Sequence, residues 1–248
     1  MYPRRFFDTF WRGDIRKDVF VAMPMNDEFN SVYEQAIRPA IRHSSVGMQP
    51  KRVDASVLSG AIVTDILDGI AHSTSVFADI SIMKTGRWNG QRNGNVMYEL
   101  GLAHAIRPET DVIVVRSDDA EINFDVAGIN IQSYPDSDLQ HAKDLFTNYL
   151  ADALRERDKL MSLIMRKARE RLDRGSLKLM LEHGEKAGFQ PFAMGKEVPL
   201  EQQLALQRLL DLDILRCEIP EHLHFHYAWT DFGKAVFHHP NFPDDQAH

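Results

Sequence analysis

The chain is organised around the stretch Asn93-Gly-Asn-Val-Met-Tyr-Glu-Leu-Gly-Leu-Ala-His-Ala105. This stretch predicts a loop that leads directly into a helix. Asn95 suits the N-cap position, since its side-chain oxygen can accept a hydrogen bond from an amide of the first turn. Gly94 allows the backbone to make the tight entry. Apolar residues then recur at helical spacing: Val96, Leu100 and Ala103. We therefore expect a helix with one face packed against the protein interior.

Glu99 lies one turn into this helix, beside the apolar stripe. A carboxylate near the positive end of a helix is favoured in its ionised form by about 0.3–1 kcal/mol. Its position is explained equally well by helix stabilisation and by a functional role. The organisation of the surrounding chain bears on that choice.

Short apolar runs that suit buried strands alternate with helical patterns over the first half of the chain. The strands are expected at 18–23, 48–53, 75–80, 111–116 and 129–133, and the first two helices at 29–41 and 62–71. This alternation predicts an α/β fold, with a five-stranded parallel sheet covered by helices on both faces. The economical arrangement is flavodoxin-like and doubly wound, with strand order 2-1-3-4-5.

In that order the winding reverses between the first and third strands, and ligands bind at such a point, outside the carboxyl ends of the strands. The two strands end in Met23-Pro24-Met25 and Asp79-Ile80-Ser81. The helix that carries Glu99 follows the loop after the third strand. The sequence therefore predicts Glu99 at the ligand pocket.

The chain divides by composition into an N-terminal arm (1–17), the α/β domain (18–138), a long connecting helix (139–171) and a smaller C-terminal domain (172–248). The arm is aromatic and basic, with Phe6, Phe7, Phe10 and Trp11 among arginines. The arm and the long helix are both hard to bury in a monomer, so we expect a homo-oligomer or a partner protein.

The C-terminal domain begins with helical patterns at 177–187 and 199–212. Strand patterns follow at 214–219 and 223–229, and a short helix at 230–237. This order, which ends in Trp229-Thr-Asp-Phe-Gly-Lys-Ala235, resembles a winged-helix domain.

The composition excludes several classes of protein. With 44% apolar and 26% charged residues, the chain is typical of a globular protein. It has no apolar run long enough to span a membrane and no signal peptide, so we expect a cytoplasmic protein with no membrane partner. Its single cysteine, Cys217, excludes a disulfide framework and a cysteine zinc site.

Familiar cofactor fingerprints are absent from the sequence. No GxGxxG follows the first strand and no GxxxxGK occurs, so neither a Rossmann dinucleotide site nor a P-loop is supported. His222, His224 and His226 would share one face of a strand and could bind zinc, but the exposed face of a wing explains this alternation better, and we expect no metal.

The net charge of −7 argues against a broad nucleic-acid-binding surface. The stretch Arg155–Arg174 is nevertheless rich in Arg and Lys, and we consider it a possible contact with nucleic acid.

Five segments occur in the order and spacing of a known family: Phe20-Val-Ala-Met-Pro-Met25, Arg52-Val-Asp54, Ser75-Val-Phe-Ala-Asp-Ile80, Asn95-Val-Met-Tyr-Glu-Leu-Gly-Leu-Ala-His104 and Phe124-Asp125. Through them, residues 18–135 resemble the nucleoside 2-deoxyribosyltransferase-like proteins, which are related in fold and chemistry to TIR-domain NAD hydrolases. The Asn-Val-Met-Tyr-Glu-Leu-Gly block is the most specific part. The resemblance implies that Glu99 is the nucleophile that attacks the anomeric carbon and displaces the nucleobase.

The resemblance further implies that the substrate is NAD or a (deoxy)nucleoside monophosphate, with no separate cofactor. Cleavage of an N-glycosidic bond passes through an oxocarbenium-like state, which a carboxylate below the sugar can stabilise or trap. Ser75 and Asn93 stand where transferases of the family carry acidic residues, which weakens the case for deoxyribosyl transfer. Asp79 is retained, and either binds sugar hydroxyls or caps the following loop.

Two side chains beside the expected pocket each have two interpretations. Arg52 pairs with a substrate phosphate or with Asp54. Trp88, in the loop 84–93, stacks on a base or nicotinamide, or rests on the domain surface. Met97 and Tyr98 are expected to be packing residues. The remaining residues expected to line the substrate pocket are Met23, Pro24, Met25, Phe29, Ser81, Asn93 and Asn95.

Relatives of this family joined to winged-helix domains are toxic effectors of anti-phage systems such as retrons. The resemblance therefore implies a regulated effector that depletes a nucleotide. The alternative is a non-catalytic module that senses a nucleotide and contacts DNA or a protein through its winged helix.

Overall fold

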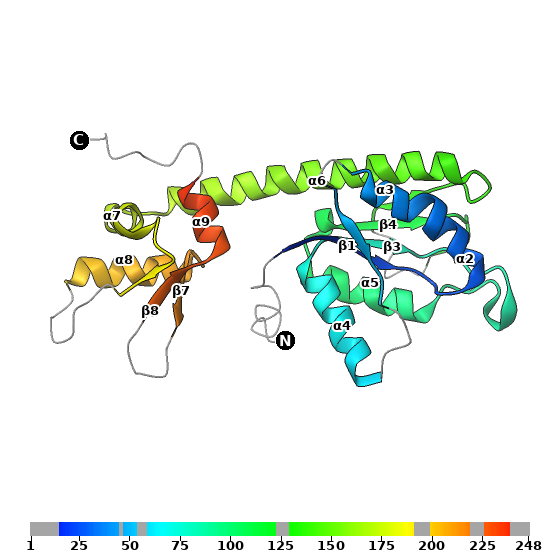
Figure 1. The fold of residues 1–248 in the computed structure, drawn as a ribbon, viewed down its shortest axis with the longest axis horizontal. Helices are drawn as coiled ribbons and strands as arrows, with labels where there is room; N and C mark the ends of the chain where they lie inside the picture. The colour runs from blue at the N-terminus through cyan, green and yellow to red at the C-terminus, as the bar shows by residue number, and fades with distance from the viewer. Residues whose placement is uncertain are drawn as a thin grey trace. The chain divides into compact units, whose positions relative to one another are not determined.

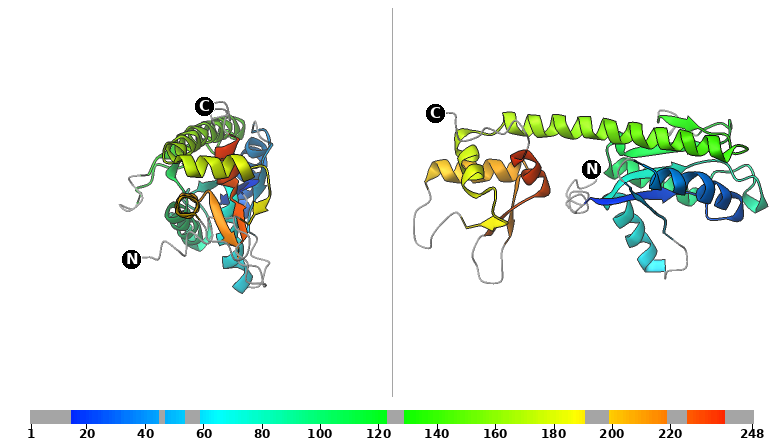
Figure 2. Two further views of the ribbon diagram at one scale, coloured as in Figure 1. Left: turned by 90° about the vertical axis from the view of Figure 1, so that its left-hand side faces the viewer. Right: turned by 45° about the horizontal axis from the view of Figure 1, so that its top comes forward.

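The computed structural model describes residues 15–44, 47–53, 59–122, 129–190, 199–218 and 226–238. The chain forms two compact units, Met1–Arg157 and Asp158–His248, each with its own hydrophobic core (Figures 1 and 2). Among the described residues, no helix has the length and apolar character needed to cross a membrane.

The first unit is built on a five-stranded sheet in which all neighbouring strands are parallel. Its strands are β1 (Arg16–Ala22), β2 (Gln49–Lys51), β3 (Ser73–Asp79), β4 (Val112–Arg116) and β5 (Ile131–Ser133). Their order is β2-β1-β3-β4-β5, which confirms the order expected from the sequence. The central strands are apolar on both faces because both faces are covered by helices.

One face of the sheet is covered by a long helical stretch and by the first part of α6 (Leu139–Glu170). The stretch consists of α2 (Asp27–Val32), a π-helical segment (Tyr33–Ile37) and α3 (Arg38–Arg42), so the single helix expected at 29–41 contains a wider turn. The other face is covered by α4 (Ser59–His72) and α5 (Gly94–Ile106). Gly69 allows α4 to approach β1 closely, because a Cβ there would lie 2.4 Å from the Phe20 ring.

A buried ion pair ties the amino ends of the strands together. Arg107 is 5% exposed and donates to the carbonyl oxygens of Ser73 and Thr74 and, at 2.7 Å, to Asp111 Oδ2. Arg157 on α6 also donates to the Thr74 carbonyl, at 2.9 Å. The pair therefore fixes α4, β3, α5 and α6 at one edge of the sheet.

The second unit contains the end of α6, α7 (Arg174–His183), α8 (Leu200–Asp211) and α9 (Asp231–Phe237). Its antiparallel sheet has the order β6-β8-β7, from β6 (Gly188–Phe189), β7 (Leu215–Glu218) and β8 (His226–Trp229). The helix expected at 177–187 starts and ends earlier, and the two-residue strand β6 was not expected. The core of this unit is centred on Met180, Leu209, Ile214 and Trp229.

Candidate active site

The helix that carries Glu99 begins earlier than the sequence predicts. Its N-cap is Asn93, whose Oδ1 accepts hydrogen bonds from the backbone N–H groups of Asn95, at 2.9 Å, and Val96, at 3.3 Å. The expected N-cap, Asn95, is instead a residue of the first turn. Glu99 therefore lies in the second turn of α5, and the first turn contains no acidic residue.

The Glu99 carboxyl group is held in a partly dehydrated position. Its side chain is half-buried, next to the buried Val96 and Leu100 on the same helix. Burial raises the pKa of Glu99 from 4.5 to about 7. Within the described residues, it forms no hydrogen bond or ion pair that would offset this burial. Burial therefore outweighs the stabilisation of the ionised form that we expected from the helix end.

The sheet places Glu99 at the edge where the winding reverses. β1 has β2 on one side and β3 on the other, so the reversal lies between β1 and β3. α5 begins after the carboxyl end of β3, and its buried residues share a core cluster with Ala22 at the end of β1 and Ile80 after β3. Its amino-terminal half, which includes Glu99, consequently lies at this edge, where doubly wound sheets bind their ligands.

Asp79 ends β3 and is fully buried. Its Oδ1 accepts hydrogen bonds from the Ser81 hydroxyl, at 2.6 Å, and the Ser81 backbone N–H, at 3.0 Å. Its Oδ2 accepts a hydrogen bond from the Tyr134 hydroxyl at 2.7 Å. Burial raises the pKa of Asp79, although these hydrogen bonds oppose the rise. Both oxygens are engaged by the protein, which supports the interpretation of Asp79 as a cap of the following loop.

Ser81 and Tyr134 connect the carboxyl ends of three strands. The Ser81 hydroxyl accepts a hydrogen bond from the Ser117 N–H, at 2.8 Å, just after β4. Tyr134 directly follows β5, and its ring packs edge-on against Phe146 of α6. Ser81 is 1% exposed, so it supports the edge of the sheet and does not present its hydroxyl to a ligand.

The loop between β3 and α5 is fixed by an ion pair that sequence reasoning missed. Arg92 donates to the carbonyl oxygen of Ile80 and to Asp118 Oδ1, the latter at 3.1 Å. Burial alone would raise the pKa of Asp118, but hydrogen bonds from Ile82 N–H and Arg92 outweigh it and lower the pKa. The only sequence signal was a cation immediately before the Asn93–Ala105 block.

The side chains expected to contact a base or phosphate have other neighbours in this structure. Trp88 is 48% exposed, and the Arg87 guanidinium lies 4.3 Å from its ring centroid. The Arg52 guanidinium lies 4.3 Å from the centroid of the Tyr33 ring, which is a cation–π contact. Its other expected partner, Asp54, lies outside the described residues, as do Phe124 and Asp125.

Several residues that were expected to line the substrate pocket lie away from Glu99 in the structure. Ser75 lies in the amino half of β3, is 2% exposed and pairs with Val19, away from the carboxyl edge. Met23 and Phe29 are buried in the core on the opposite face of the sheet. The buried Pro24 and the 45%-exposed Met25 do follow β1 at the expected edge. Tyr98 is 59% exposed, so it is not a packing residue, whereas Met97 packs against the core.

Two cavities of the first unit were not expected. One, of about 110 Å³, lies at the carboxyl edge and is lined by Glu28, Phe29, Lys84 and Tyr134, among others. Lys84 pairs there with Asp136, and its backbone N–H donates to Glu28.

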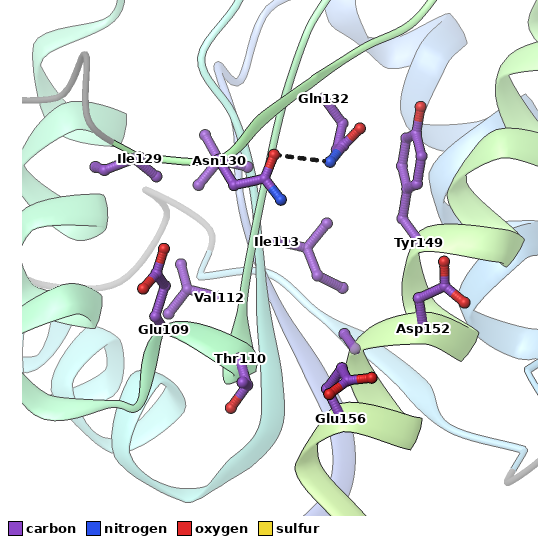
Figure 3. A pocket seen from close by; sticks show the side chains of 12 residues that line it. Glu109, Thr110, Val112, Ile113, Ile129, Asn130, Gln132, Tyr149, Asp152 and Glu156 are labelled. Atoms are coloured by element: carbon purple, nitrogen blue, oxygen red, sulfur yellow. Dashed lines mark hydrogen bonds between the residues drawn. The ribbon is translucent and has the colours of Figure 1, made fainter.

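The other, of about 330 Å³, lies beside the amino end of β4, between that strand and α6 (Figure 3). Glu109, Asp152 and Glu156 line it, and although Asp152 pairs with Arg155, this acidic lining disfavours the phosphate groups of a nucleotide. The Glu99 edge remains the better candidate for a nucleotide site.

Neither a metal site, in the part of the chain that the structure describes, nor a known family can be assigned to the chain. No group of three potential ligands suited to a metal ion occurs among the described residues, from which His222 and His224 are absent. No protein-family model matches the chain, and no curated protein shows significant sequence similarity to it.

Proposed function

We propose that the protein cleaves the N-glycosidic bond of a nucleotide, with Glu99 as the nucleophile. The observation that carries this proposal is a half-buried carboxyl group with a pKa of about 7 and no partner among the described residues. It lies at the carboxyl edge of an all-parallel sheet, where doubly wound folds bind their ligands. A carboxyl group that a fold holds in a costly environment is a candidate for chemistry, because burial without a partner does not stabilise a protein.

The chemistry follows from the ionised form of Glu99. One carboxylate oxygen forms a bond to the anomeric carbon while the bond from that carbon to the base nitrogen breaks. The base leaves with the electron pair: nicotinamide, attached through a cationic nitrogen, leaves neutral, whereas a purine or pyrimidine base also takes a proton from solvent. Water then hydrolyses the glycosyl ester, which releases the sugar and restores the carboxylate. Partial burial strengthens the attraction between the carboxylate and the positive charge that develops on the sugar.

The substrate class follows from the resemblance and from the side chains at this edge. NAD and (deoxy)nucleoside monophosphates both join a base to a phosphorylated sugar. The exposed ring of Trp88 is available to stack on a base, and Arg52 would have to leave Tyr33 to reach a phosphate. The second unit has the order α7, β6, α8, β7, β8 and α9; this order resembles a winged helix and supports a regulated effector of an anti-phage system.

The competing function is a nucleotide sensor without catalysis. The observation that favours it is the closed environment of Asp79, whose carboxylate is occupied by Ser81 and Tyr134. Ser75, in its buried position, cannot replace a catalytic acid, and Asn93 is committed to capping α5. Under this alternative, ligand binding would be retained and base release would be absent.

Incubation with NAD, nucleosides and nucleoside monophosphates, followed by chromatography for free base, separates the two functions. We expect base release by the wild type and a loss of about a thousandfold or more in Glu99→Gln, with Glu109→Gln as an exposed carboxylate control. Because the nucleophile must be ionised, kcat/KM should rise with pH up to about 7 and then level off.

A fall in kcat/KM above pH 7 would instead assign Glu99 as a proton donor. Equal base release by the wild type and by a folded Glu99→Gln variant would remove Glu99 from the mechanism. Binding of a nucleotide without any release of base would favour the sensor.

A further inference from the structure

We propose that the second unit binds the phosphodiester backbone of nucleic acid through the junction of α6 and α7, and not through α8. The junction carries six cationic side chains, which we call the basic corner: Arg166, Lys167, Arg169, Arg171, Arg174 and Lys178. This inference does not depend on the proposed chemistry of Glu99.

The basic corner concentrates positive charge on an acidic protein. Residues 166–178 contain these six cations and two acids, Glu170 and Asp173, so their net charge is +4 in a chain of net charge −7. All the cations except the half-buried Arg169 are exposed. Such a local surface attracts an anionic polymer even though the whole protein is negative.

The two acids of this segment do not neutralise the corner. Asp173 is committed elsewhere, because its side chain caps α7 by accepting from Ser176 N–H and pairs with Arg208 of α8 at 2.9 Å. Glu170 lies 3.9 Å from both Arg166 and Lys167, which is long for an ion pair at an exposed site and contributes little. Within the described residues, Arg169, Arg171 and Arg174 have no ion-pair partner.

The corner also has the shape of a binding site. A groove of about 340 Å³ runs between the helices, lined by Arg166, Arg169, Glu170 and Leu177. Arg166 and Arg169 lie about one turn apart on α6, so their guanidinium groups can contact phosphate oxygens from the same side. Leu177 provides an apolar wall on α7. Planar guanidinium groups along a groove suit a run of phosphates better than a single free anion.

The helix in the position of a recognition helix is poorly suited to this role. In α8 the single cation, Arg208, is held by Asp173, and Glu201 and Asp211 are acidic. Its outer face exposes Leu200 by 69% and Leu204 by 56%. A face of this composition repels phosphates, so a nucleic acid would bind at the basic corner instead.

Fluorescence anisotropy with labelled 20-nucleotide duplex DNA, single-stranded DNA and single-stranded RNA tests the proposal on the full chain, at 50 to 200 mM salt. The corner variant is Arg169→Gln/Arg171→Gln/Arg174→Gln. The charge-matched control carries Lys17→Gln/Arg42→Gln/Arg87→Gln, at exposed cations of the first unit. The α8 variant is Leu200→Ala/Leu204→Ala. Thermal melting of each variant checks the fold.

We expect the wild type to bind at least one of the three probes at 50 mM salt. The corner variant should bind it roughly tenfold more weakly or worse, and the slope of log affinity against log salt should flatten by about 2–3. The control and the α8 variant should change the affinity by less than about twofold. If the corner variant does not fold, Arg166→Gln/Lys167→Gln provides the same test.

Three results would overturn the inference. These are the absence of binding to all three probes at 50 mM salt, an equal loss in the charge-matched control, or a larger loss in the α8 variant. None of them bears on base release, so the proposed function would stand or fall separately.

Discussion

Glu99→Gln is expected to stabilise the protein at alkaline pH while it abolishes activity. In the folded protein the pKa of Glu99 is raised by burial from 4.5 to about 7, so the folded state binds this proton more tightly than the unfolded chain does. Ionisation therefore costs the folded state nothing below pH 4.5. The cost grows as the pH rises from 4.5 to 7 and is fully present above 7. Gln keeps the size of the side chain and removes the charge.

The magnitude follows from that pKa change. At about 1.4 kcal/mol for each tenfold change in the ionisation constant, a rise from 4.5 to about 7 corresponds to an upper limit of about 3 kcal/mol. The gain of Glu99→Gln should approach this limit at pH 8 and stay below about 1 kcal/mol at pH 5. An amide also loses hydration on burial, so the measured gain should be smaller than the limit.

Urea unfolding of the wild type and of Glu99→Gln at pH 5 and pH 8 measures this difference directly. Glu121→Gln, at an exposed carboxylate, is the matched control and should change stability equally at both pH values. A Glu99→Gln variant that is no more stable than the wild type at pH 8 would refute the reasoning. The carboxylate would then be hydrated or paired, and the electrostatic case for the site would fail with it.

Three further substitutions test the buried contacts of the first unit. Tyr134→Phe removes the 2.7 Å hydrogen bond to Asp79 and should cost about 1–3 kcal/mol in urea unfolding; no cost would mean that Asp79 is satisfied without it. Gly69→Ala places a Cβ 2.4 Å from Phe20 and should also cost about 1–3 kcal/mol, so unchanged melting would show that the ring can move aside. Arg107→Met leaves the buried Asp111 carboxylate with only its 3.9 Å contact to Arg157 and should cost about 3–5 kcal/mol; a stable, soluble variant would contradict a structural role for the pair.

The sheet could be predicted from the sequence because its strands carry their own signal. β1, β3 and β4 contain apolar runs that are buried on both faces, and β1 and β3 are each followed by helical segments. Parallel pairing and strand order then follow from the handedness of the connections. The ends of elements were less predictable. Asn93 and Asn95 are both suitable N-cap residues, and the sequence does not indicate that Asn93 caps α5. The π-helical turn at Tyr33–Ile37 has no sequence signal that we recognise.

The position of Glu99 could be predicted, but most of its surroundings could not. The position of Glu99 could be predicted because the helix pattern is a local property of the sequence and the strand order is set by the topology of the sheet. The network around Asp79 depends on Tyr134, which lies 55 positions further along the chain. Arg92 and Asp118 are likewise brought together only by the folding of two loops. Such contacts depend on tertiary structure, and no spacing rule in one sequence indicates them.

Two opposing effects act on the Glu99 carboxyl group, and burial is the larger of them. A helix dipole acts within the first turn and contributes about 0.3–1 kcal/mol, whereas removing water from an unpaired carboxylate can contribute several times more. Because α5 starts at Gly94, with Asn93 as its N-cap, Glu99 lies beyond the turn where the dipole is strongest and beside residues that the core buries. A pKa of about 7 leaves both the carboxylate and the acid populated at neutral pH. A positive charge that develops on a bound sugar would favour the carboxylate, so the substrate itself would lower this pKa as the reaction proceeds.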